Sequence, residues 1–79
     1  MPIFRIRMIN AEFESCDESE FASLDAASRN AINSGARVVA EAVVSGSSVS
    51  AVELLIHAEE RLVAHHIVNM SVTDLLTRE

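Results

Sequence analysis

The sequence predicts an α+β fold: a small antiparallel sheet of strand-strand-helix-strand-strand order, one long helix packed on one face, and a short C-terminal helical turn. Apolar and polar side chains alternate over residues 3–9, which is the period of a half-buried strand. Small apolar side chains then recur at helical spacing between Ser23 and Gly46. The chain has 79 residues, about half of them apolar, so we expect residues 1–79 to form a single domain.

The first strand is expected to bury one side. Phe4, Ile6 and Met8 fall on that side, and Arg5 and Arg7 fall on the other, because successive side chains of a strand point to opposite faces.

A turn is expected at Asn10-Ala11, after which residues 12–14 can return as a short second strand with Phe13 pointing inward. Six acidic residues follow one another here without an intervening arginine. They are Glu12, Glu14, Asp17, Glu18, Glu20 and Asp25. This run predicts a solvated loop ahead of the helix, and its spacing is not that of a calcium-binding loop.

The helix is expected to begin after Ser23, which can cap its N-terminus, and to end near Gly46, which tolerates a left-handed conformation. Its packing face comprises Leu24, Ala27, Ala31, Ile32, Gly35, Val38, Val39 and Ala42. The other face carries two i,i+4 pairs of opposite charge, Asp25 with Arg29 and Arg37 with Glu41. The small residues of the packing face predict a helix that lies close to the sheet.

Residues 50–70 fit two structures on periodicity alone. Residues 50–53, Ser-Ala-Val-Glu, have the form of a capping box for a second helix. Residues 52–58 and 62–69 also read as two apolar strands around Glu59-Glu60.

In the hairpin alternative, pairing across the two glutamates places Glu53 opposite His66, Leu55 opposite Ala64 and His57 opposite Leu62. The opposite face, toward the helix, would hold Val52, Leu54, Ile56, Ala58, Val63, His65 and Ile67. Two glutamates suit a tight primed turn poorly, so a four-residue loop over residues 58–61 is expected.

After the hairpin, residues 71–74 can start one turn of C-terminal helix that buries Leu75 or Leu76.

Several segments resemble a known family. Residues 1–6 (MPIFRI), 23–27 (SLDAA), 52–56 (VELLI) and 61–63 (RLV) are similar to short alphaproteobacterial proteins grouped as family 6894 of the domains of unknown function. The resemblance spans nearly the whole chain, implies a bacterial source and favours the hairpin over residues 50–70, but it implies no chemistry. A weaker resemblance, carried by the Leu24, Ala27 and Ala31 spacing, is to antitoxins of the HicB type, whose usual extra DNA-binding segment is absent from this sequence.

Composition narrows the possible partners. The net charge is −6, and all six basic residues are arginines, so nucleic acid is not an expected partner. Cys16 is the one cysteine and cannot close an internal disulfide, which favours a reducing, cytoplasmic location. No signal-peptide pattern and no apolar run long enough to span a membrane is recognisable, so no membrane association is expected.

No cofactor or catalytic set is expected, and we predict that the protein is not an enzyme. Cys16 lies among carboxylates that disfavour a thiolate, and two glycines are too few for most nucleotide-binding loops. Three histidines are candidate metal ligands, but His65 and His66 would point to opposite faces of a strand. In the hairpin alternative only His57 and His66 share a face, and zinc needs three or four converging ligands.

The uncovered sheet face is the best candidate surface for function. We expect it to carry Arg5, Arg7, Glu53, Leu55, His57, Leu62 and His66. The sequence therefore predicts a non-enzymatic interaction module, a homodimer or the partner of another protein, with this face or an edge strand as its interface. Two alternatives stay open: a small-molecule or metal-binding domain using the region of His57 and His66, and an antitoxin-like partner-binding protein.

Overall fold

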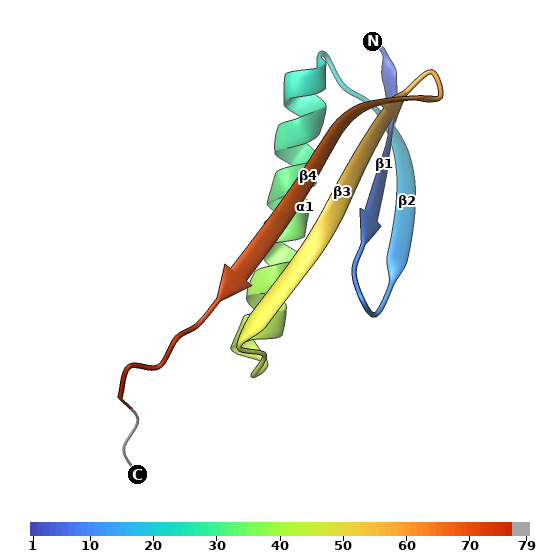
Figure 1. The fold of residues 1–79 in the computed structure, drawn as a ribbon. Helices are drawn as coiled ribbons and strands as arrows, with labels where there is room; N and C mark the ends of the chain where they lie inside the picture. The colour runs from blue at the N-terminus through green and yellow to red at the C-terminus, as the bar shows by residue number, and fades with distance from the viewer. Residues whose placement is uncertain (77–79) are drawn as a thin grey trace.

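The fold is a four-stranded antiparallel sheet with one helix on one of its faces (Figure 1). The computed structural model describes residues 1–76. Its elements are β1 (Ile3–Ile9), β2 (Glu14–Glu20), α1 (Leu24–Val44), β3 (Val49–Ala58) and β4 (Arg61–Ser71), and the strands lie in the order β2-β1-β3-β4. The predicted α+β class and the predicted order of elements are confirmed, and residues 50–70 form a hairpin.

Strand β1 follows the prediction, with Phe4 and Met8 buried beneath the helix and Ile6 packed against the core. The predicted turn after it is held by Asn10, whose side-chain oxygen accepts hydrogen bonds from the backbone N–H groups of Glu12 and Phe13. Phe13 lies in this turn and is 40% exposed, so the prediction that it points inward from a short strand was wrong.

Strand β2 corrects the prediction of an acidic loop. Residues 14–20 pair with β1 along its whole length, from Ile9 opposite Glu14 to Ile3 opposite Glu20. All seven residues of β2 are exposed. An edge strand without a buried face has no apolar alternation, which explains why the pattern of residues alone did not reveal it.

The helix begins and ends as predicted. The Ser23 hydroxyl accepts a hydrogen bond from the Ala26 N–H at 3.1 Å, and Ser45 caps the C-terminus just before Gly46, whose φ is +119°. Arg29 Nε donates to Asp25 Oδ2 at 3.0 Å, whereas the expected pairing of Arg37 with Glu41 is not among the ion pairs of residues 1–76.

A narrow stripe of small side chains fixes the helix on the sheet. Ala27, Ala31, Gly35 and Val39 are buried, while Leu24 and Ile32 lie at the exposed margin of the predicted face. The stripe faces the fully buried side chains of β3, which are Val52, Leu54 and Ile56. A Cβ atom placed on Gly35 would lie 3.0 Å from Val52 Cγ2, so a larger residue would push the helix away from the sheet.

The turn between β3 and β4 is tighter than predicted. Ala58 pairs directly with Arg61, so Glu59 and Glu60 alone make the turn. Their φ angles are +52° and +68°. Positive φ at both central residues is the backbone of a type I′ hairpin turn, which matches the twist of the flanking strands despite its cost to non-glycine residues. The predicted four-residue loop was therefore wrong.

A β-bulge then changes the register of β4. His57 pairs with Leu62 as predicted, but Ile56 pairs with Ala64, which leaves Val63 as an extra residue without a partner. One inserted residue moves every later side chain to the opposite face. Glu53 is therefore opposite Ile67, and Leu55 is opposite His65, in place of the predicted pairings with His66 and Ala64.

The C-terminal segment departs from the prediction as well. Strand β4 continues to Ser71, no helical turn forms over residues 72–76, and Leu75 and Leu76 are 94% and 73% exposed. Of the helices in residues 1–76, none has the length and apolar character needed to cross a membrane.

Candidate functional site: the open face of the sheet

The candidate site is the sheet face opposite α1, which we call the open face. The alternation of each strand and the pairing between strands place the following side chains on it: Glu14, Cys16, Glu18 and Glu20 of β2; Ile3, Arg5, Arg7 and Ile9 of β1; Val49, Ala51, Glu53, Leu55 and His57 of β3; and Leu62, His65, Ile67 and Asn69 of β4.

Most of the predicted interaction residues do lie together on this face. Pairing between β1 and β3 puts Arg5 directly opposite His57 and Arg7 directly opposite Leu55. Leu62 follows as the partner of His57 on β4.

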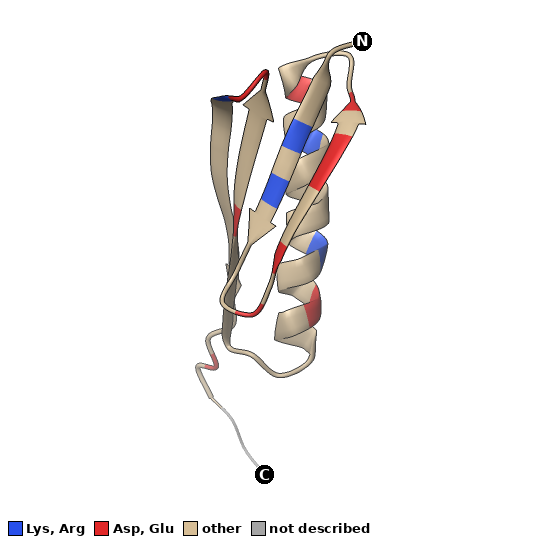
Figure 2. Cartoon of the chain, turned by 90° about the vertical axis from the view of Figure 1, so that its right-hand side faces the viewer, with Lys and Arg blue, Asp and Glu red and all other residues tan. Residues whose placement is uncertain are grey.

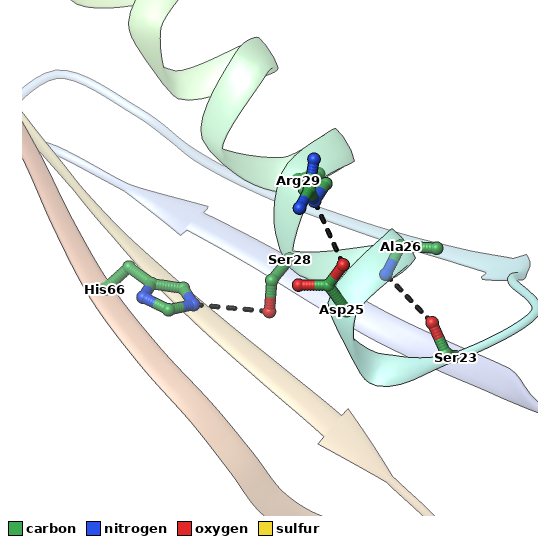
Figure 3. A network of polar contacts seen from close by, with 6 residues as sticks. All are labelled: Ser23, Asp25, Ala26, Ser28, Arg29 and His66. Carbon is green, nitrogen blue, oxygen red and sulfur yellow. Dashed lines mark hydrogen bonds and ion pairs between the residues drawn. The ribbon is translucent and has the colours of Figure 1, made fainter.

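His66 does not belong to the open face, and its placement there was wrong. It is opposite Leu54, whose side chain is fully buried beneath the helix. Its ring projects toward α1, where Nε2 lies 3.3 Å from the Ser28 hydroxyl oxygen (Figure 3). His57 and His66 are thus on opposite faces of the sheet and cannot bind one ligand together.

His65 takes the place expected for His66. Its Nε2 lies 2.5 Å from Glu53 Oε2, across two neighbouring strands of the open face. The extra residue Val63 is the reason that His65, and not His66, lies on the open face. Neither a glycine nor another local feature of the sequence marks this bulge. Across residues 1–76, no three His, Cys, Asp or Glu side chains are grouped closely enough to hold a metal ion.

Strands β1 and β2 carry charged residues of opposite sign (Figure 2). Acidic side chains occupy β2, and the two arginines Arg5 and Arg7 occupy β1 beside it. Arg7 Nη2 and Nε donate to Glu14 Oε2 at 2.7 and 3.2 Å, and this hydrogen bond is the main reason that the pKa of Arg7 is raised. The pair is solvent-exposed, so it orients the two side chains more than it stabilises the fold.

Apolar side chains dominate the rest of the open face. Val49 is 67% exposed, Ile67 65%, Ile3 56% and Leu62 51%, and Leu55 is half-buried among them. Strand β4 has no acidic residue over its whole length. The face therefore runs from an acidic edge at β2, through a basic strand, to an edge at β4 that has exposed apolar side chains and no acid.

The fold and the face define a class of protein: a small helix-covered antiparallel sheet with an exposed, chemically graded surface. Comparison of the chain with family models, with curated proteins and with solved structures finds no match in any of the three. The resemblance to family 6894 accordingly stays a prediction, and function is argued from the geometry alone.

Proposed function

We propose that the protein is a non-enzymatic interaction module that self-associates by packing its open face against the open face of a second copy. The observation that carries this proposal is the set of large apolar side chains exposed along this face, namely Ile3, Val49, Leu62 and Ile67, each at least half exposed. Several large apolar side chains exposed on one face of a small protein favour an interaction site there.

Charge selects the orientation of the two copies. A twofold axis perpendicular to the strands would place β2 of one copy over β2 of the other, with Glu14, Glu18 and Glu20 facing like charges. A twofold axis parallel to the strands instead places β2 of each copy over β4 of its partner. On this face β4 contributes His65 and no acid, so this second arrangement removes the contact between like charges.

The area of the open face determines how stable the proposed dimer is expected to be. Four strands about 4.8 Å apart and about 24 Å long cover roughly 450 Å² per copy, or roughly 900 Å² in total. That lies below the range of about 1,200–2,000 Å² that stable complexes bury. The dimer is therefore expected to form and dissociate with concentration, not to be permanent.

Light scattering coupled to size exclusion, over at least a hundredfold range of protein concentration, tests this proposal. The molar mass of the wild type should rise toward that of a dimer. Leu55→Glu and Ile67→Glu place a charge in the face and should keep the protein monomeric. Val44 lies at the end of α1 and is 87% exposed, so Val44→Glu should leave dimer formation unchanged. Circular dichroism establishes that each variant is folded. Assembly that is unchanged in both face variants would refute the face-mediated dimer.

A further inference from the structure

A cavity of about 660 Å³ lies at one end of the open face, between the start of the chain and the β3–β4 turn. Pro2, Ile3 and Val63 give it apolar walls, and Arg5 and His57 are among its polar lining residues.

Two backbone irregularities form this cavity. The bulge at Val63 bends β4, and the turn of Glu59 and Glu60 adopts positive φ at both residues. In Figure 1 the tip of the β3–β4 hairpin bends away from α1, toward the side of the open face. Strained turns and bulges gather at binding sites because they redirect side chains.

Two buried polar atoms at the cavity are without a hydrogen-bond partner among the described residues. They are Arg5 Nε and His57 Nδ1, and the two residues are direct partners across β1 and β3. Buried polar groups in folded proteins are nearly always paired, so two unpaired atoms on register partners indicate bonds that another group completes. Arg5 also forms no ion pair with any residue from 1 to 76.

From these observations we infer that the cavity binds a small carboxylate with an apolar body. The planar guanidinium of Arg5 matches the two oxygens of a carboxylate, and the ring of His57 supplies a second donor beside it. Because Arg5 Nε has no partner, the guanidinium can turn toward the ligand without breaking a hydrogen bond within residues 1–76. The apolar body then lies against Pro2, Ile3 and Val63.

The acidic residues of the cavity limit the charge of the ligand. Glu18, Glu59 and Glu60 also line it, and so does Arg61, the second arginine of the lining. The three carboxylates repel a dianion more strongly than a monoanion, so a single carboxylate is favoured over a phosphate. This inference goes beyond the proposed dimer and does not depend on it, because Arg5 and His57 belong to one chain.

Nuclear magnetic resonance of the ¹⁵N-labelled full chain, at a concentration where it is monomeric, tests the inference. Pentanoate is titrated while the Arg5 Nε–H, the His57 ring and the backbone amides are followed. We expect saturable shifts at Arg5 and His57 in the millimolar range. Pentanol and pentylamine share the apolar body without the carboxylate and should give no saturable shift, and phosphate should bind more weakly than pentanoate.

Variants locate the site. Arg5→Gln and His57→Gln should each weaken pentanoate binding at least tenfold, and Arg37→Gln, on the exposed side of α1, should leave it unchanged. The backbone spectrum establishes that each variant is folded. Equal responses to pentanoate and pentanol, tighter binding of phosphate, or an equal loss in Arg37→Gln would overturn the inference, and the first of these needs only the wild-type protein.

Discussion

The two hairpins of this sheet differ in how much apolar side chain they bury beneath α1. In the β3–β4 hairpin, Val52, Leu54 and Ile56 are buried completely beneath α1. In the β1–β2 hairpin, β1 contributes Phe4 and Met8 to the core, but every residue of β2 is exposed. Strand β2 is therefore held by its backbone hydrogen bonds to β1 and by surface pairs such as Arg7 with Glu14. Local unfolding is expected to begin at β2, since it loses almost no apolar burial when it opens.

The same contrast governs the two edges of the sheet. The β2 edge carries Glu14, Asp17, Glu18 and Glu20, which oppose pairing with a second acidic strand. The β4 edge carries no acidic residue, and a bulge near its start interrupts its pairing with β3. Charge thus protects the β2 edge, which is consistent with the proposal that association uses the open face.

The largest expected effect is the loss of unfolding free energy when a core side chain of β3 is shortened. Leu54→Ala in β3 should cost about 2–5 kcal/mol of unfolding free energy, because it leaves a cavity in the core. A core of this size contributes about 3–5 kcal/mol in all, so that variant should be largely unfolded, and Ile56→Val, at about 0.5–1.5 kcal/mol, gives a measurable companion.

Cys16→Ala in β2 is the matched control and should change the unfolding free energy by less than about 0.5 kcal/mol, because Cys16 is exposed. Urea denaturation at one fixed protein concentration measures all of these proteins. If Cys16→Ala lowered the unfolding free energy as much as Ile56→Val does, the conclusion that β3 contributes more to stability than β2 would be wrong.

The sequence predicted the elements with a buried face better than it predicted the exposed strand β2. The limits of β1 and of α1 were accessible because local rules determine them: alternation over residues 3–9, a cap at Ser23 and a glycine at position 46. Strand β2 was not accessible, since its pairing depends on the free edge of β1 and not on any apolar pattern of its own. The candidate face was predicted except for His66, which the bulge at Val63 moved to the helix side.

The cavity shows why the rest of the site could not be predicted. The cavity depends on that bulge together with a two-residue turn. The turn consists of two glutamates, which are not the residues usually found in such a turn. Arg5 and His57 were each identified as residues of the face, but their pairing across β1 and β3 is a matter of register between distant segments.

The second prediction concerns the strained turn of the β3–β4 hairpin. Replacing Glu59-Glu60 by Asn-Gly should stabilise the protein by roughly 1–2 kcal/mol, because these residues adopt positive φ at lower cost. Thermal or urea unfolding measures the gain. The variant Glu59→Gln/Glu60→Gln removes the charges and keeps the backbone cost, so it should give a smaller gain. An equal gain in both variants would assign the effect to charge repulsion instead of backbone strain.

The smallest effect tests how closely α1 lies on β3. In Gly35→Ala the new Cβ would lie 3.0 Å from Val52 Cγ2 and 3.4 Å from Leu54 Cδ1. Helix propensity favours alanine by about 1 kcal/mol, but overpacking of a filled core costs about 1–3 kcal/mol. Val52 is β-branched and cannot easily turn aside, so the net result should be a loss of about 1 kcal/mol.

A double-mutant cycle with Val52→Ala separates these two contributions to the effect of Gly35→Ala. Removing the Val52 methyl groups creates the room that the new Cβ needs, so in that background Gly35→Ala should be neutral or stabilising. Urea denaturation of the four proteins gives the coupling energy. If Gly35→Ala stabilises the wild type by the full helix-propensity gain, the helix can move away from β3 at no cost. The tight packing that distinguishes the β3–β4 hairpin from β2 would then not be what holds α1 in place.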